Sequence, residues 1–244
     1  MEQFVCEIVS NRQLTANVFE MVLESPNDAG LRPGQFVDIK IDGFYLRRPI
    51  SVCDADGSSF KLIYKTVGRG TDRLSSMSAG EKLDVLLGLG NGYELEKSGD
   101  APLLLGGGVG VPPLYYLARM LKKQGKDVHV VLGFNSADEI FYENEFKELG
   151  CNVAVTTADG SYGIKGFVTD ALPENYSHVY TCGPEPMLKA VYKSTNTSGQ
   201  YSFEERMGCG FGACMGCSCK TITGFKRICK DGPVLFKEEI LWED

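Results

Sequence analysis

Four cysteines near the C-terminus constrain the fold of this chain more than any other feature of its sequence. The run ERMGCGFGACMGCSC places four residues between Cys209 and Cys214 and two between Cys214 and Cys217, and eleven more precede Cys229. The run is rich in glycine, which has no Cβ and lets a loop wrap tightly while its N–H groups point at sulfur. The sequence therefore predicts a compact loop on which four thiolates converge.

The spacing of these cysteines also indicates the kind of site. It is typical of a loop that holds a [2Fe–2S] cluster, so Cys209, Cys214, Cys217 and Cys229 are the predicted metal ligands. A structural zinc site is the alternative, although zinc sites usually pair two C-x2–4-C units rather than one asymmetric loop. The short final spacing favours a small appended module over a free-standing ferredoxin domain. Cys219 breaks the spacing and is expected to be a packed thiol.

Length and composition restrict the fold class and the partners. The 244 residues and the 43% hydrophobic content allow two domains and a small module. The opening MEQFVCEIV alternates like a strand and lacks the basic region of a signal peptide, so the nine cysteines are expected to be reduced thiols in the cytoplasm. No run of about 18 apolar residues occurs, and the net charge is −7. We therefore expect neither a membrane nor a nucleic-acid partner.

The order of apolar runs and turns divides the chain into three parts. Residues 1–98 contain short strands separated by turns such as Pro33-Gly34, which predicts an antiparallel β-barrel. From residue 99 the strands alternate with helices, which predicts an α/β domain over residues 99–205. Its five strands, APLLLGGG, VHVVLGF, CNVAVTT, HVYTC and YSFEE, predict a parallel sheet. Residues 206–244 form the predicted cluster module.

Local signals place the helices of the second part. Pro at the start and Gly125 at the end predict a helix over residues 112–124. Ser136 and Glu139 predict a capping box for a helix that ends near Leu149. A further helix is expected from about Glu185.

Two segments of the predicted barrel suit a flavin cofactor. In YLRRPISV, Arg48 can meet a pyrophosphate, Ser51 can hydrogen-bond a ring system and Ile50 offers an aliphatic wall. Alone, this segment fits a basic edge strand followed by a turn equally well. The loop GRGT, over residues 68–71, favours the flavin, because small residues can cradle phosphate through backbone amides.

Two segments of the α/β domain suit a nicotinamide dinucleotide. GGGVGVPP, with Gly107, Gly108 and Gly110, follows a predicted strand and opens a helix, where free N–H groups favour phosphate. The strict G-x-G-x-x-G fingerprint is absent. CGPEPML follows a later strand, and its Cys182 and Gly183 precede a Pro that can also simply start a helix.

The motifs RPIS, GRGT, GLGNGY, GGGVGVPP and CGPEPML, in this order behind a barrel, resemble the ferredoxin–NADP⁺ reductase superfamily. With the cysteine loop and with Ile in RPIS, the chain resembles the electron-transfer subunits of class 1B dihydroorotate dehydrogenases over its whole length. The resemblance implies no catalytic side chain but two cofactor sites. The residues that it implies for the FAD site are Arg48, Pro49, Ile50, Ser51, Ile63, Tyr64, Lys65, Gly70 and Thr71. The residues that it implies for the NAD site are Gly107, Gly108, Gly110, Cys182, Gly183 and Pro184.

The resemblance also implies a function and a partner. Electrons would pass from dihydroorotate through the FMN of a partner catalytic subunit, then through the cluster and FAD, to NAD⁺ in pyrimidine (UMP) biosynthesis, in a heterotetramer of two copies of each subunit. One alternative is an NADH-dependent flavin and iron–sulfur reductase that serves an oxygenase or a ferredoxin. Others are a bifurcating transhydrogenase subunit, in which we expect an Asp among the cluster ligands, and a zinc-stapled flavoprotein binding module.

Overall fold

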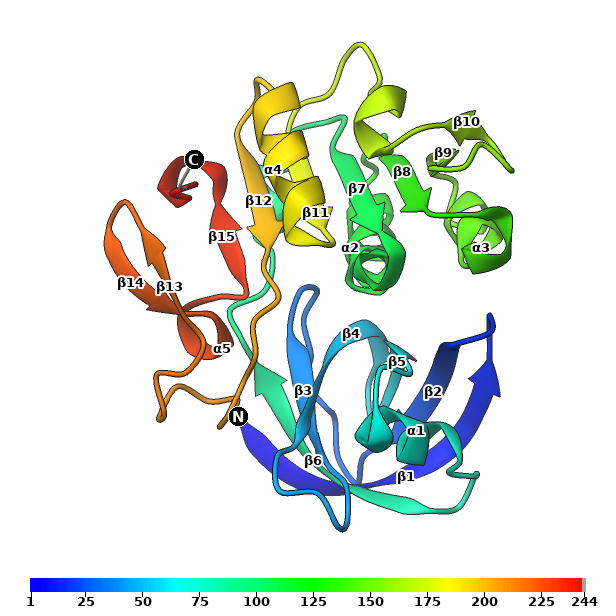
Figure 1. Cartoon of the computed structure of the whole chain (residues 1–244), viewed down its shortest axis with the longest axis vertical. Helices are drawn as coiled ribbons and strands as arrows, with labels where there is room; N and C mark the ends of the chain where they lie inside the picture. Colours follow the sequence, from blue (N-terminus) through cyan, green and yellow to red (C-terminus); the bar gives the residue numbers. More distant parts are fainter. Residues whose placement is uncertain (243–244) are drawn as a thin grey trace.

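The computed structural model describes residues 1–242, so residues 243–244 of the predicted cluster module lie outside the described part. Two domains are stacked along the long axis of the molecule, and a smaller module lies along one side of both (Figure 1). The N-terminal part of the chain forms the lower domain in this view and the middle part forms the upper one.

The lower domain is a closed barrel of six antiparallel strands in the order β1-β2-β5-β4-β3-β6, which confirms the predicted barrel. Alternate residues of each strand face the interior, where Val37 and Ile39 of one strand pack with Val52 and Leu62 of others. A short helix, α1 (Arg69–Ser75), follows the fifth strand. The barrel strands are β1 (Glu2–Gln13), β2 (Val18–Glu24), β3 (Phe36–Lys40), β4 (Arg48–Asp56), β5 (Ser59–Lys65) and β6 (Lys82–Leu89).

The upper domain contains a seven-stranded sheet in the order β10-β9-β8-β7-β11-β12-β15. The neighbours from β10 to β12 run parallel and include all five predicted strands. The last strand, β15, pairs antiparallel with β12, with Leu235 opposite Tyr201. The strands are β7 (Leu103–Gly107), β8 (His129–Phe134), β9 (Asn152–Thr157), β10 (Ile164–Lys165), β11 (Val179–Cys182), β12 (Gly199–Ser202) and β15 (Val234–Phe236).

Two long helices of this domain begin where the sequence indicates. The first, α2 (Val111–Lys123), has Pro in its first turn and is followed by Gly125 at a φ of 77°. The second, α4 (Glu185–Ser194), starts one residue after Pro184. The connections contain short 3₁₀ turns: η1 (Leu95–Lys97), η2 (Gly108–Gly110), η3 (Ala137–Glu139) and η4 (Val168–Ala171).

The predicted capping box at Ser136 and Glu139 is wrong. Ser136 makes no capping hydrogen bond, and the Glu139 carboxylate instead accepts one from the side-chain amide of Asn135 at 2.8 Å. This local bond closes a 3₁₀ turn, and the helix α3 (Glu143–Glu148) begins only after Tyr142, which lies in the left-handed region at a φ of 69°.

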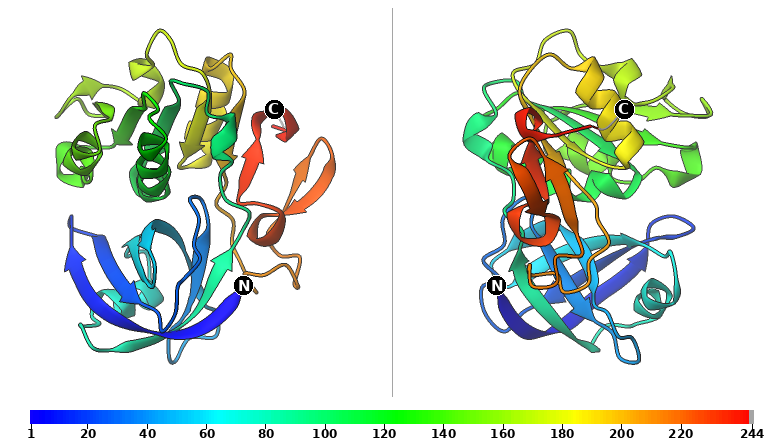
Figure 2. Two further views of the ribbon diagram at one scale, coloured as in Figure 1. Left: turned by 180° about the vertical axis from the view of Figure 1, so that it is seen from behind. Right: turned by 60° about the vertical axis from the view of Figure 1, so that its left-hand side comes forward.

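The third part of the chain forms a small module beside both domains. It contains the cysteine loop, a hairpin of β13 (Ser218–Thr221) and β14 (Gly224–Arg227), the short helix α5 (Ile228–Asp231) and the turn η5 (Lys237–Glu239). The hairpin fills most of the interval between Cys217 and Cys229. Figure 2 shows the hairpin and the loop along the same outer side of the molecule.

Helix α2 holds the upper domain against the barrel. The hydroxyl of Tyr116 donates to the carbonyl of Leu31 at 3.0 Å. One turn further on, Arg119 pairs with Asp54 of β4 at 2.7 Å and donates to the next carbonyl at 2.6 Å. Since β4 also carries the predicted flavin segment, these contacts fix helix α2 relative to the strand that carries that segment.

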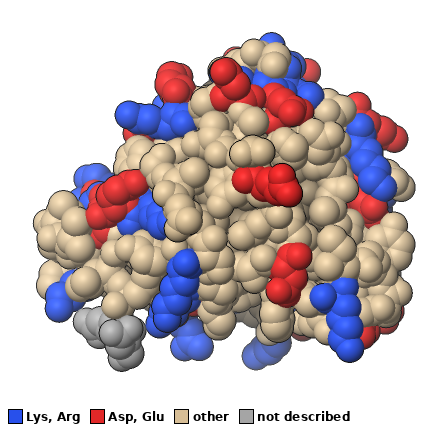
Figure 3. Space-filling model, turned by 90° about the horizontal axis from the view of Figure 1, so that it is seen from above, with Lys and Arg blue, Asp and Glu red and all other residues tan. Residues whose placement is uncertain are grey.

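The outer face of the upper domain carries both signs of charge. In Figure 3, lysine and arginine side chains are interspersed with aspartate and glutamate over this face. Within residues 1–242, no helix is long and apolar enough to span a bilayer.

Candidate functional site: a cluster loop, a flavin strand and a nucleotide edge

The predicted flavin segment, Arg48 to Ser51, forms the N-terminal half of β4. Arg48 to Ser51 pair with β3, with Ser51 opposite Phe36 and Arg48 opposite Ile39. The register of β4 with β5 ends at Val52 opposite Leu62. The predicted FAD residues of β4 and β5 therefore lie just beyond the point where these two strands stop pairing with each other.

Two arginines share one aromatic ring beside this segment. The guanidinium carbon of Arg48 lies 5.0 Å from the Phe44 ring centroid, and that of Arg69 lies 5.8 Å from it. A Cβ at Gly70 would come within 2.3 Å of Arg48 Nε, so a larger residue there would displace the Arg48 guanidinium. Guanidinium pairs are suited to pyrophosphate, and the arrangement fits the FAD expected from the sequence. Arg69 and Phe44 were missed, although Arg69 lies within GRGT.

The hydroxyl of Thr71 is already used by its own turn. It accepts the N–H of Val67 at 2.9 Å and donates to the carbonyl of Gly68 at 2.9 Å. The GRGT segment, expected to be a loop, is the first turn of α1; Thr71 shapes this turn, and the backbone of the turn is the part available to a phosphate.

Three other residues predicted for FAD have packed side chains. Tyr64 is 2% exposed, and its hydroxyl donates to Asn11 at 2.9 Å inside the barrel. Ile50 packs against the same core, and Ile63 is buried where the barrel meets the upper domain. For these residues we expect contacts with FAD through the backbone, whereas the half-buried Lys65 keeps an available side chain.

The two predicted NAD segments meet at adjacent strand ends. Gly107, Gly108 and Gly110 form the turn from β7 into α2, and Cys182 ends the neighbouring parallel strand β11. A Cβ at Gly110 would lie 2.2 Å from the carbonyl oxygen of Cys182, so the two turns are in direct backbone contact. Carboxyl ends of parallel strands and helix N-termini are the usual place for a dinucleotide, and this edge fits one.

Gly183 and Pro184 continue this edge into α4. Pro184 is the N-cap of the helix, and its carbonyl accepts the N–H of Met187 at 2.9 Å. A Cβ at Gly107 would meet the Met187 sulfur at 2.5 Å, so the side chain of Met187 covers the glycine turn from the other side.

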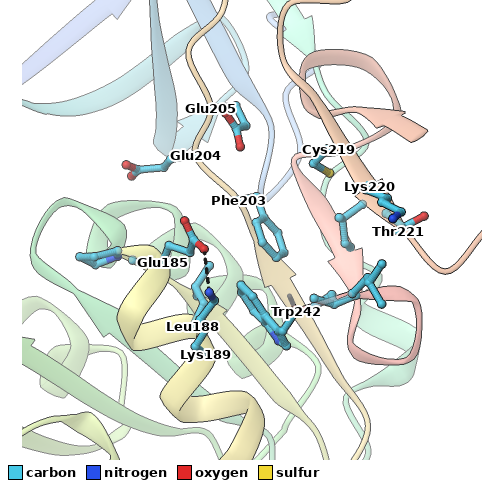
Figure 4. Close-up of a pocket in the computed structure, with 15 residues that line it drawn as sticks. Glu185, Leu188, Lys189, Phe203, Glu204, Glu205, Cys219, Lys220, Thr221 and Trp242 are labelled. Carbon is cyan, nitrogen blue, oxygen red and sulfur yellow. Dashed lines mark ion pairs between the residues drawn. The ribbon is translucent and has the colours of Figure 1, made fainter. Parts of the chain in front are cut away.

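A pocket of about 540 Å³ extends from this edge to the small module. Gly183 and Pro184 are among its lining residues, and Phe203 and Trp242 lie between Glu185 of α4 and Cys219 on the opposite wall (Figure 4). Cys219 thus lines this pocket, whereas none of the four predicted ligands does, although it packs in the same apolar cluster as Cys217 and Cys229.

The four predicted cluster ligands gather at the barrel side of the module. Cys217 and Cys229 are each 2% exposed, Cys209 is half-buried and Cys214 is exposed. Backbone N–H groups donate to three of the sulfurs: that of Ala213 to Cys209 at 3.2 Å, that of Gly216 to Cys214 at 3.4 Å and that of Cys229 to Cys217 at 3.4 Å. Sulfurs that accept backbone N–H groups suit a cluster that gains negative charge, so this donor set fits iron and sulfide.

The electrostatic environment differs between the two ends of this set. For Cys209, burial acts to raise the pKa, but the N–H groups of Cys214, Phe211 and Ala213 outweigh it and bring the pKa to about 6. For Cys229, burial raises the pKa to about 12, and the neighbouring thiols of Cys217 and Cys209 add to the rise. Cys209 is thus influenced by Cys214, and Cys229 by Cys217 and Cys209. Within residues 1–242, no three His, Cys, Asp or Glu side chains are arranged around a single ion.

The segment after β8 favours NAD(H) over NADP(H). A 2′-phosphate needs Arg or Lys after the second strand of the domain, and none occurs between Lys126 and Lys147. The stretch instead contains Asp138, Glu139, Glu143 and Glu145 after β8, and Asp127 just before it. We expect a catalytic efficiency with NADPH at least about tenfold lower than with NADH, a cost of about 1.4 kcal/mol. Steady-state dye reduction with each nucleotide measures this, and equal efficiencies would contradict it.

Two parts of the chain match family models. Residues 204–241 match the iron–sulfur cluster binding domain of dihydroorotate dehydrogenase B. Residues 104–193 match the oxidoreductase NAD-binding domain. The first match decides between the two kinds of metal site weighed from the cysteine spacing, in favour of iron and sulfur.

Solved structures of reductases and oxidoreductases have a similar fold. An NADH-dependent reduced ferredoxin-NADP oxidoreductase, studied for flavin-based electron bifurcation, is 34% identical with a TM-score of 0.89, over 97% of this chain and 90% of that one. The ferredoxin reductase in carbazole 1,9a-dioxygenase is 23% identical with a TM-score of 0.69, over 79% of this chain and 64% of that one. At this lower identity the likeness concerns the fold.

Curated relatives match over nearly their whole length. The dihydroorotate dehydrogenase B (NAD(+)) electron transfer subunit of Shouchella clausii is 44% identical over 96% of both chains. The protein of the same name from Fusobacterium nucleatum is 43% identical over 96% of this chain and 97% of its own. Together with the cluster loop, the flavin strand and the nucleotide edge, these relatives show that the chain belongs to the family of dihydroorotate dehydrogenase B (NAD(+)) electron transfer subunits.

Proposed function

We propose that this chain passes electrons from the FMN of a partner dihydroorotate dehydrogenase catalytic subunit, through a [2Fe–2S] cluster and FAD, to NAD⁺ in pyrimidine biosynthesis. One observation supports the proposal: the three segments that carry the predicted sites contact one another in this order. The cysteine loop packs on β3, since a Cβ at Gly210 would touch Asp38, and β3 pairs with the flavin segment of β4. Helix α2 then fixes β4 to the sheet edge that suits the nucleotide.

The protein groups of this path bind and orient rather than react. When bound, FAD exchanges electron pairs with a nicotinamide and single electrons with a cluster, which is why it stands between them. Arg48 and Arg69 would hold its pyrophosphate beside Phe44. The turns at Gly110 and Gly183 would hold the nucleotide at the edge that faces the barrel. Cys209, Cys214, Cys217 and Cys229 would hold the cluster.

The exposed ligand indicates where the partner docks. Cys214 is exposed, whereas Cys217 and Cys229 face the interior. Around Cys214 the loop presents Phe211 at 44% exposure and Met215 at 55%. Met215 lies in the left-handed region at a φ of 60°. This backbone conformation is strained for a residue other than glycine. We propose that this surface contacts the catalytic subunit and that two copies of each subunit assemble.

The hairpin of the same module also carries exposed apolar side chains. Ile222, in its turn, is 62% exposed, and Phe225 of β14 is 74% exposed. Sequence analysis missed both, because a single apolar residue in a short strand does not reveal whether it is covered.

A charge on the loop should weaken assembly without affecting the nicotinamide half-reaction. Phe211→Glu or Met215→Glu removes an apolar contact of about 2 kcal/mol, which corresponds to roughly 30-fold weaker binding of the catalytic subunit. Phe167→Glu, at a side chain 68% exposed on the upper domain, is the matched control. Calorimetric titration measures the affinity and NADH-to-dye turnover measures the integrity of the chain. Equal affinity for the loop and control variants would contradict the proposed surface.

The function itself is tested with the isolated chain loaded with FAD and cluster. We expect it to reduce dyes with NADH and to leave dihydroorotate unchanged, because the sites described account for one flavin, one cluster and one nucleotide. Addition of the FMN-containing catalytic subunit should restore NAD⁺ reduction by dihydroorotate. Turnover of dihydroorotate by the isolated chain, or an assembled complex that fails to reduce NAD⁺, would refute the proposal.

A further inference from the structure

Strand β3 separates the flavin segment from the cysteine loop. Its alternate residues face opposite sides: Val37 and Ile39 lie in the barrel core, whereas Phe36 lies in the apolar cluster that contains Cys217 and Cys229. Asp38 is two residues from Phe36, so it is on the same side of the strand. The side of β3 that faces the module therefore carries one aromatic and one acidic residue.

Asp38 is a buried carboxylate in contact with the cysteine loop. Its residue is 2% exposed, and within residues 1–242 its Oδ1 has no hydrogen-bond partner. A Cβ at Gly210 would come within 2.3 Å of its Oδ2, and Gly210 itself has a φ of 76°. Gly210 directly follows the ligand Cys209. A buried carboxylate with one oxygen left without a hydrogen-bond partner is costly, so its position against this turn calls for a role.

The groups around Asp38 come from both the flavin strand and the cluster loop. Its backbone pairs with Pro49, and its carbonyl accepts from Arg47 at 3.2 Å. Arg47 is itself paired with Asp84 at 2.9 Å, so it does not neutralise Asp38 alone. Burial raises the pKa of Asp38 to about 6, with Arg47 and Arg48 opposing the rise and Cys209 adding to it.

We propose that Asp38 is a positioning residue for the cluster: its carboxylate holds the Cys209–Gly210 turn against β3, next to the flavin segment, and places a negative charge beside the ligand sulfur. The inference deepens the proposed function and rests on it. A negative charge beside a cluster opposes the arrival of an electron, so Asp38 lowers the reduction potential of the cluster. The contact with Gly210 keeps the loop at a fixed separation from β4.

The test separates the charge from the contact. Asp38→Asn keeps the shape and removes the charge, and we expect the midpoint potential of the cluster to shift to more positive values with the iron content unchanged. Asp38→Ala also removes the contact, and we expect several-fold faster loss of iron to a chelator and a broadened electron paramagnetic resonance signal. Both are measured at one mildly alkaline pH in the chain loaded with FAD and cluster.

Asp56→Asn is the control, because Asp56 is exposed at the other end of β4. It should leave the potential and the rate of iron loss at the wild-type values. NADH-to-dye turnover should be unchanged in all three variants. If both Asp38 variants match the wild type in potential, signal shape and iron loss, the inference is wrong and the proposed function stands. A wild-type chain that binds FAD but shows no [2Fe–2S] signal would overturn the proposed function and the inference with it.

A double-mutant cycle tests the contact with Gly210 directly. Gly210→Ala should accelerate iron loss in the wild-type background, because its Cβ would clash with Asp38 Oδ2. The same change should do less harm in the Asp38→Ala background, where the clash is gone and the left-handed backbone remains the only cost. Additive effects of the two substitutions would overturn the contact.

Discussion

Replacement of any one of Cys209, Cys214, Cys217 and Cys229 by serine is expected to remove most of the visible absorption of the cluster. A hard hydroxyl replaces a soft thiolate, and iron–sulfur clusters select thiolates. Loss of a partner that only supports a metal ligand costs ~10–100-fold in affinity, so loss of a ligand should cost at least as much. Electron transfer from the catalytic subunit to FAD should be lost, while NADH-to-dye turnover through FAD should remain. Absorption spectra and iron content measure the outcome.

Two other cysteines provide controls for this series. Cys219→Ser changes a thiol of the same module that lines the pocket, and Cys151→Ser changes a buried thiol of the upper domain. Both should retain the cluster. Retention of the cluster in Cys217→Ser together with its loss in Cys219→Ser would show that the ligands are assigned wrongly.

The features that could be predicted from the sequence are those that depend on residues close together in the chain. The barrel follows from the alternation of apolar residues between turns, and α2 follows from an apolar face between Pro and Gly125. The cysteine loop is recognised because its spacing and glycines are local. Each barrel strand, helix α2 and the loop from Cys209 to Cys217 lies within a segment of fewer than about 15 residues, where adjacent side chains largely determine the backbone geometry.

The features that the sequence did not reveal depend on contacts between distant segments. Strand β15 forms only because β12 offers it an edge, and its three residues carry no periodicity. The capping box predicted at Ser136 is wrong because the Glu139 carboxylate accepts a hydrogen bond from Asn135 instead. The pair of Asp38 and Gly210 is 172 positions apart in the chain, so no local pattern connects them. Contacts of this kind require the tertiary structure.

Replacement of Gly110 by alanine is expected to have the largest effect in the nucleotide-binding edge. Its backbone is ordinary, with a φ of −80°, so the cause is the missing space: a Cβ would lie 2.2 Å from the carbonyl oxygen of Cys182 and 2.6 Å from the N of Gly183. Both are backbone atoms of a buried strand end and cannot turn aside. Overpacking of this kind costs about 3 kcal/mol, which corresponds to a Tm roughly 6–12 °C lower for a chain of this size. NADH-to-dye turnover should fall with it, because the two turns are pushed apart.

Replacement of Gly108, two residues earlier, by alanine provides a comparison that separates the effect of steric clash from that of backbone strain. Gly108 has a φ of 52°, yet no atom lies within 4 Å of an added Cβ. Alanine there costs the left-handed conformation, about 1–2 kcal/mol, and gains part of this back by restricting the unfolded chain. The Tm should therefore fall much less than in Gly110→Ala, whereas the methyl group, which enters the open space at the nucleotide turn, should raise the KM for NADH. Thermal unfolding and steady-state kinetics of the two variants distinguish the causes: equal losses of Tm would mean that the contact between the turns at Gly110 and Cys182 does not hold the edge together.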